Sequence, residues 1–303
     1  MEEQKVCPVA KKCGGCSWQG ISYEEQLKKK QKQIKKLLKD ICPVEPIIGM
    51  KNPYHYRNKA QYPVGIDKEG NPTIGVFANR SHEVVAIEGC LIQNPMSEKI
   101  AKTIVEFAQN NNISIYNEKT GKGLLRHVVT KIGIKTQEIM CILVINGNQI
   151  PNENKLIELL IKEFPNIKTI VKNINNKNTN VILGKENINI YGDGYIEDKL
   201  GKYTFKISPL SFYQVNPIQA EKLYNIGVEA AKITKNDIVF DLYCGIGTIS
   251  LFMAQYAKKV YGVEIVEQAI EDAKENAKIN NVNNTEFITG NAEIVLDDLI
   301  NNK

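Results

Sequence analysis

The stretch Ile238-Val-Phe-Asp241-Leu-Tyr-Cys-Gly245-Ile-Gly247-Thr248 decides the fold of the last third of the chain. It passes from a short apolar run into a glycine turn and then into a segment of helical character, residues 248–256. Two glycines this close together let the backbone turn sharply and approach a ligand closely. Strand, glycine turn and helix in this order predict the first unit of a parallel α/β sheet.

The residues on either side of the turn extend this pattern. We expect a helix at 216–231, a strand at 259–263, a helix at 267–280 and a strand at 285–289. Strands that alternate with helices in this way predict parallel βαβ units. The three strands should pair in the order 3-2-1, which leaves strand 238–242 at an exposed edge of the sheet.

Two acidic residues indicate where a cofactor should bind. Asp241 and Glu264 stand at the ends of consecutive expected strands, where an acidic side chain can accept hydrogen bonds from ribose hydroxyls. The dinucleotide fingerprint needs a third glycine three positions after Gly247, and Ser250 in that place disfavours a nicotinamide cofactor. S-adenosylmethionine is cationic and has no phosphate, so it suits such an acidic pocket. The alternative is a glycine turn with a structural role in some other α/β domain.

The middle of the chain, from about residue 47 to 200, alternates short β-rich runs with turn signals. These runs predict strands at 59–66, 73–77, 83–87, 127–134, 139–145, 169–172, 180–183 and 203–207. Helices are expected at 95–109 and 154–163. The pattern predicts an α+β domain with an antiparallel sheet.

Three of the seven cysteines lie within the first 16 residues. Cys7, Cys13 and Cys16 have the spacing C-x5-C-x2-C, with two glycines in the last interval. An odd cysteine count without a signal peptide argues against a disulfide framework and favours a thiolate metal or cluster site. The spacing fits an iron–sulfur cluster or a zinc ion equally well. The candidates for a fourth ligand are Cys42, Cys90, Cys141 and Cys244.

The charge of the chain is concentrated near its start. The net charge is +5 over 303 residues, and residues 1–50 hold ten Lys against six acidic residues. Many of these lysines fall on an expected amphipathic helix at 23–40, which permits phosphate contacts, although many basic faces are simply solvated. No apolar run is long enough to span a membrane, and the N-terminus lacks a signal peptide, so we expect a cytoplasmic protein without membrane contact.

Taken together, these residues resemble those of a known family, the RNA (uracil-5-)-methyltransferases, in particular the iron–sulfur-bearing 23S rRNA enzymes. The motifs that carry the resemblance are Cys7-Pro through Lys12-Cys13-Gly-Gly-Cys16, Tyr56-Arg57-Asn58-Lys59-Ala60, Gly89-Cys90, Ser208-Pro-x-Ser211-Phe-Tyr213-Gln214-Val-Asn216, and Asp241-Leu-Tyr-Cys-Gly-x-Gly247. They extend over nearly the whole chain.

The resemblance implies a three-part organisation. Residues 1–46 would form an iron–sulfur segment with a basic helix, and residues 47–207 a central antiparallel-sheet α+β domain that binds RNA. Residues 208–303 would form an incomplete Rossmann-like class I methyltransferase domain. The expected partner is RNA, with rRNA favoured over tRNA because the tRNA-directed bacterial relatives usually lack the cysteine cluster.

The resemblance also assigns residues to two cofactors. It makes Cys90 the fourth ligand, so that Cys7, Cys13, Cys16 and Cys90 would hold a [4Fe–4S] cluster. It adds Gln214, Tyr243 and Asn291 to the S-adenosylmethionine contacts. The expected cofactor-binding set is Gln214, Asp241, Tyr243, Gly245, Gly247, Thr248, Glu264 and Asn291.

The chemistry that the resemblance implies needs a residue that this sequence does not supply. In the family, a cysteine thiolate adds to C6 of uracil, C5 then accepts the methyl group, and a carboxylate removes the C5 proton. The target base must first leave its stack. Both groups normally follow the third Rossmann strand, and no matching Asp-Pro-Pro or Ser-Cys-Asn motif is found here. We therefore assign no catalytic nucleophile and expect a C-terminally truncated chain that transfers no methyl group.

Two further functions stay open from the sequence. One is a non-catalytic protein that retains RNA and S-adenosylmethionine binding, and the other is a tRNA (uracil-5-)-methyltransferase. A zinc-bearing RNA-binding module is a weaker third possibility.

Overall fold

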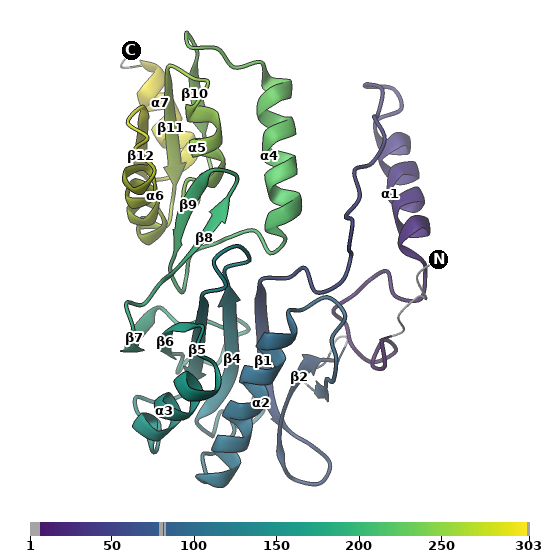
Figure 1. Ribbon diagram of the computed structural model, residues 1–303, viewed down its shortest axis with the longest axis vertical. Coiled ribbons are helices and arrows are strands. Elements are labelled where there is room, and N and C mark those ends of the chain that lie inside the picture. Colours follow the sequence, from purple (N-terminus) through teal and green to yellow (C-terminus); the bar gives the residue numbers. More distant parts are fainter. Residues whose placement is uncertain (1–6, 79–80, 82, 302–303) are drawn as a thin grey trace.

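The structure is a computed structural model, and it describes residues 7–78, 81 and 83–301. Three sheets are present within these residues (Figure 1): a large central sheet, a two-stranded hairpin and a three-stranded parallel sheet near the C-terminus. The boundaries expected between residues 46 and 47 and between 207 and 208 stay a prediction.

The central sheet has the strand order β3-β2-β1-β4-β5-β6-β7 in the described part of the chain. Its strands are β1 (Lys59–Ile66), β2 (Pro72–Phe77), β3 (Val84–Ala86), β4 (Leu125–Ile132), β5 (Ile139–Ile145), β6 (Ile167–Ile174) and β7 (Glu186–Tyr191). The expectation of an antiparallel sheet is wrong for one pair, because β5 and β6 run parallel. Helix α3 (Glu153–Glu163) connects them, and a parallel pair needs a crossover of this length.

The two faces of the central sheet enter two different cores. On β5, Cys141 and Leu143 pack into the core that includes α2 (Pro95–Asn110), whereas Met140 and Ile142 point the other way. Successive strand side chains alternate between faces, so every residue of β5 is buried although the strand lies in only one sheet. The second face packs against the C-terminal part of the chain.

The C-terminal part has the expected α/β alternation. Strands β10 (Ile238–Asp241), β11 (Lys259–Glu264) and β12 (Thr285–Thr289) are parallel and adjacent in that order. This confirms the predicted 3-2-1 pairing and places β10 at an edge of the sheet, where Ile238 is 45% exposed. The accompanying helices are α4 (Pro217–Ala231), α5 (Thr248–Ala254), α6 (Glu267–Ile279) and α7 (Ala292–Asn301).

The hairpin of β8 (Ile196–Leu200) and β9 (Tyr203–Ile207) joins the two large parts of the fold. Its β9 strand is tied to α6, because the side chains of Asn276 and Asn280 accept hydrogen bonds from the backbone N–H groups of Lys206 and Thr204 at 2.7 and 2.8 Å. The same Asn276 donates to the Ile246 carbonyl in the glycine loop at 3.0 Å. One buried amide thus fixes the hairpin relative to the loop.

The strand expected at 180–183 is wrong. In its place lies an irregular loop, whose carbonyls at Val181, Ile182 and Gly184 accept hydrogen bonds from the side chains of Asn173 and Asn175. Because buried amides satisfy this backbone locally, it has no need of a neighbouring strand. The strand that pairs with β6 begins only at Glu186.

Helix α1 (Tyr23–Leu37) lies beside the body of the protein and has no fully buried side chain among its described residues. A connecting segment of residues 43–50, here termed the strap, runs from it towards α4 (Figure 1). Within the described residues, no helix combines the length and apolar character that a membrane span requires.

Candidate functional site

The glycine loop lies between β10 and α5 and has the backbone that its sequence predicts. Gly245 and Gly247 have φ values of +53° and +78°, in the left-handed region that favours glycine. A side chain at Gly247 would come within 3.0 Å of the Phe287 ring, whereas one at Gly245 would meet nothing within 4 Å. Gly247 is therefore needed for internal packing, and Gly245 leaves open space above the loop.

Glu264 closes β11 beside this loop. Its carboxylate accepts hydrogen bonds from the backbone N–H of Gly245 at 3.2 Å and of Val266 at 3.1 Å. An ionised carboxylate can accept about four hydrogen bonds, so acceptor capacity remains for a ligand. The loop and the acid therefore meet at the carboxyl ends of adjacent parallel strands, where open α/β sheets bind their ligands.

Asp241 closes β10 and is partly buried beside the same loop. It accepts a hydrogen bond of 2.6 Å from the Ser250 hydroxyl. Burial raises the pKa of Asp241, and the neighbouring carboxylate of Glu264 raises it further. Ser250 stands where the dinucleotide fingerprint would have its third glycine, and its role here is to hold the carboxylate of Asp241.

The remaining residues of the predicted cofactor-binding set surround the loop to different degrees. Tyr243 is 76% exposed, and its hydroxyl lies 3.4 Å from a carboxylate oxygen of Glu293. Thr248 begins α5, and its hydroxyl lies 3.3 Å from the Tyr224 hydroxyl of α4. Asn291 accepts from the backbone N–H of Glu293 at 2.9 Å, so it caps the start of α7.

Gln214 is the predicted residue that the structure joins least firmly to the loop. Its side chain has no hydrogen bond to another described residue. Its backbone carbonyl accepts a hydrogen bond of 3.1 Å from the side chain of Asn58, which directly precedes β1. This contact fixes the Gln214 segment against the central sheet and leaves its amide side chain available to a ligand.

A buried polar network holds the segment that leads to Gln214, and the sequence did not indicate it. The ammonium group of Lys131 in β4 donates to the carbonyls of Ser208 and Ser211 at 2.7 and 2.8 Å. The hydroxyls of the same two serines donate to the Asp272 carboxylate of α6. Burial lowers the pKa of Lys131 to about 7, Lys59 adds to this effect, and Asp272 opposes it.

The sequence indicates only part of this network. The Ser208-Pro-x-Ser211 motif is visible in the sequence, but its partners are a lysine in a strand with other polar residues and an acid on a charged helix. Both Lys131 and Asp272 are buried, with exposed fractions of 5% and 3%. Nothing in their sequence neighbourhood distinguishes them from surface residues.

The four cysteines of the predicted cluster share one neighbourhood. Burial raises the pKa of the Cys16 thiol, and the nearby Cys90, Cys13 and Cys7 raise it further. Cys13 bridges the end of β2 through its backbone pairing with Ala78. However, no group of three or more His, Cys, Asp or Glu side chains among the described residues is arranged to hold a metal ion. The thiols are thus neighbours but not in the geometry of a single-ion site.

The other cysteines lie elsewhere. Cys42 is exposed after α1, and Cys141 is fully buried in β5. Cys244 lies under the glycine loop, 4% exposed, and its pKa is raised by burial and by the carboxylates of Asp241 and Glu264. The burial and raised pKa of Cys244 do not suit a thiolate nucleophile.

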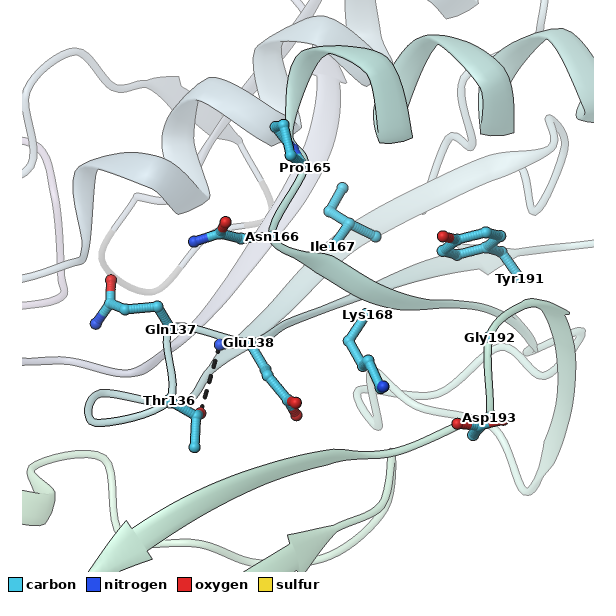
Figure 2. A pocket seen from close by; sticks show the side chains of 10 residues that line it. All are labelled: Thr136, Gln137, Glu138, Pro165, Asn166, Ile167, Lys168, Tyr191, Gly192 and Asp193. Carbon is cyan, nitrogen blue, oxygen red and sulfur yellow. Dashed lines mark hydrogen bonds between the residues drawn. The ribbon is translucent and has the colours of Figure 1, made fainter.

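A separate cavity of about 490 Å³ opens at the N-terminal ends of the parallel strands β5 and β6 (Figure 2). Polar groups of Glu138, Lys168 and Asp193 line it together with the ring of Tyr191. It contains no residue of the predicted cofactor-binding set, so this hollow is distinct from the glycine-loop site.

The chain is similar in sequence to a known protein family and to proteins of several bacteria. The family profile described as tRNA (Uracil-5-)-methyltransferase matches residues 22–302. A protein of Clostridium tetani named "Uncharacterized RNA methyltransferase" is 46% identical over 298 residues, covering 97% of this chain and 65% of that protein. One of Caldanaerobacter subterraneus with the same kind of name is 48% identical over 293 residues, covering 95% of this chain and 64% of that protein.

A solved structure extends the comparison to the fold. The tRNA (uracil-54, C5)-methyltransferase of Pyrococcus abyssi, in complex with S-adenosyl-L-homocysteine, superposes with a TM-score of 0.75 at 26% identity. The match covers 92% of this chain and 65% of that chain. This chain therefore spans about two thirds of the length of the proteins that it matches.

Proposed function

Because the chain belongs to the tRNA (uracil-5-)-methyltransferase family, we propose that it acts in S-adenosylmethionine-dependent methylation of C5 of a uridine in RNA. The observation that carries the proposal is the meeting of the glycine loop and Glu264 at the carboxyl ends of β10 and β11. A structural neighbour with the same arrangement of elements was solved with S-adenosyl-L-homocysteine, which supports this choice of cofactor.

The residues of the loop fit S-adenosylmethionine. Glu264 accepts ribose hydroxyls with its remaining lone pairs, and the open space at Gly245 lets the cofactor approach the backbone. The exposed ring of Tyr243 offers an apolar face to the adenine, and the free amide of Gln214 offers hydrogen bonds to a polar group. When bound, the cofactor supplies an electrophilic methyl group on its sulfonium sulfur.

We further propose that Cys7, Cys13, Cys16 and Cys90 hold a [4Fe–4S] cluster. The proposal rests on their spacing and on the mutual influence of their thiols at Cys16. A zinc ion would hold its ligand sulfurs within about 4 Å of one another. A four-iron cluster is a larger object and separates its ligand sulfurs further.

The cluster is tested by metal analysis of anaerobically purified protein. About four irons per chain are expected, with loss of iron in Cys90→Ala and no loss in the control Cys42→Ala. Zinc without iron would exclude the cluster but keep the site. Equal iron in both variants would remove Cys90 from the ligand set.

Two observations favour different classes of RNA as the substrate. The cysteine motif favours rRNA, whereas the solved neighbour is a tRNA-modifying enzyme. Deleting the gene and measuring 5-methyluridine by mass spectrometry, separately in 23S rRNA and in tRNA, decides between them. Loss from one class names the substrate. Unchanged 5-methyluridine in both classes would overturn the proposed function.

A second candidate function is binding of RNA and cofactor without turnover by the 303 residues alone. It is favoured by the burial of Cys244, the thiol that the glycine loop itself contains. Returning only these 303 residues to the deletion strain tests it. Restored 5-methyluridine would show that a nucleophile is present, with Cys244 the first residue to replace.

A further inference from the structure

Among the described residues, helix α1 is held by one of its sides. Tyr23, Leu27 and Gln31 recur at four-residue intervals and all lie against the strap, Leu27 beside Gly49. The Tyr23 hydroxyl accepts from the backbone N–H of Met50 at 2.7 Å, and Gln31 donates to the Glu45 carbonyl at 3.0 Å. Residues four apart lie on the same side of an α-helix, so these contacts define the inner side of α1.

The opposite side of α1 carries a stripe of three lysines, Lys29, Lys32 and Lys36. At about 100° per residue, they point roughly opposite to Tyr23, Leu27 and Gln31. All three are exposed, and none forms a hydrogen bond or ion pair with another described residue. By contrast, Lys28 pairs with Glu24 and Lys30 lies over the Trp18 ring.

The like charges of this stripe repel one another. Lys29 and Lys32 are three residues apart and Lys32 and Lys36 four apart, so each pair repels by about 0.2–0.5 kcal/mol. No buried apolar face compensates within the described part of the helix. An anionic partner that neutralises several charges at once would remove the repulsion, and successive lysines about 5–6 Å apart can reach neighbouring phosphates of one strand.

The strap connects the stripe to the candidate cofactor site. The side chain of Gln219 in α4 donates to the Ile48 carbonyl of the strap at 3.0 Å. Asn216, two residues after Gln214, contacts the sulfur of Met50 at 2.8 Å. The lysine stripe is thus fixed relative to the Gln214 segment, as a docking surface for a substrate must be.

We propose that Lys29, Lys32 and Lys36 bind the sugar–phosphate backbone of the RNA substrate outside the target nucleotide. The inference rests on the proposed function, since the match to an RNA methyltransferase family is what favours RNA over other polyanions. These contacts contribute affinity and position but no sequence preference, as phosphate contacts do.

The test compares two triple charge reversals in the full chain. Lys29→Glu/Lys32→Glu/Lys36→Glu reverses the stripe, and Lys99→Glu/Lys155→Glu/Lys162→Glu reverses three exposed lysines of α2 and α3 with the same change in net charge. RNA affinity is measured by fluorescence anisotropy over a series of salt concentrations. S-Adenosylhomocysteine affinity, measured by calorimetry, shows that each variant is folded.

The stripe variant should bind RNA at least about tenfold more weakly at low salt, and its log–log salt slope should fall by about three. The α2/α3 variant should keep the wild-type slope. Equal effects in both variants would overturn the proposal and leave the proposed function intact, whereas absence of RNA binding by the wild type would count against both. Loss of binding to anionic vesicles with unchanged RNA affinity would assign the helix to a membrane surface instead.

If the stripe reversal prevents folding, Lys29→Gln/Lys32→Gln/Lys36→Gln replaces it. This variant removes the charges without introducing acids, and its salt slope should fall by the same amount. An unchanged slope in the glutamine variant would likewise refute the proposal.

Discussion

Replacing Lys131 by methionine removes one amine from the buried network and keeps most of the side-chain volume. At high pH the folded protein holds a neutral amine, whose two N–H groups match the two carbonyls that it contacts. The Ser208 carbonyl also accepts from the Ser211 N–H, so about one buried acceptor loses its partner in the variant. We therefore expect Lys131→Met to lower the free energy of unfolding by about 1–3 kcal/mol at pH 9.

The effect of this substitution should depend on pH. The pKa of Lys131 is about 7 in the folded protein and 10.5 in an unfolded chain, with burial as the main cause. Between these values the unfolded chain binds more protons, so the stability of the wild type rises with pH. From pH 7 to pH 9 the gain is about 2 kcal/mol, which the methionine variant lacks. The two proteins should consequently differ little at pH 7.

Urea unfolding at pH 7, 8 and 9 measures this difference, because titrations common to both proteins cancel. Lys162→Met, at an exposed position in α3, is the control and should show no pH-dependent difference from the wild type. A stability difference for Lys131→Met that is the same at pH 7 and pH 9 would mean that the amine stays protonated throughout. That result would refute the reasoning.

Three further predictions concern the cofactor site and the sheet edge. Glu264→Ala should weaken S-adenosylhomocysteine binding about 10- to 100-fold by calorimetry, since hydrogen bonds to a charged group are worth about 1.5–3 kcal/mol, whereas the exposed Glu267→Ala should bind normally. Iodoacetamide should modify Cys42 rapidly and Cys244 only after unfolding, as peptide mass mapping would show; early modification of Cys244 would contradict its burial. Ile238→Lys should reduce self-association in light scattering, because a charge protects an exposed strand edge; unchanged scattering would argue that β10 is not the contact.

Much of the α/β part could be predicted because its signals are local. An apolar strand, a glycine turn and an acid at the next strand end each depend on a few neighbouring residues, and the structure has them in place, although β10 itself lies at the sheet edge and is not buried. The 3-2-1 order followed because parallel connections by short helices leave few topologies. The edge position of Ile238 follows from the same order.

The errors occurred where distant residues decide the structure. The parallel pairing of β5 and β6 depends on where α3 crosses the sheet, which the alternation of residues within each strand does not reveal. The loop at 180–183 is β-rich in sequence, but the amides of Asn173 and Asn175 bind its carbonyls and prevent pairing. Lys131 and Asp272 looked like surface residues because their partners lie far away in the sequence.

The buried cluster that unites the central sheet with the C-terminal part has a consequence for protein engineering. It combines Met140, Ile142 and Val144 of β5 with Leu251 and Ile270 of the α/β unit, so the two parts share one set of interlocking side chains. A chimera that exchanges only the cofactor-binding half between relatives would mismatch this set. Successful grafts would have to carry the inner face of β4–β6 along with the glycine loop, and natural substitutions on either side should be found as matched pairs.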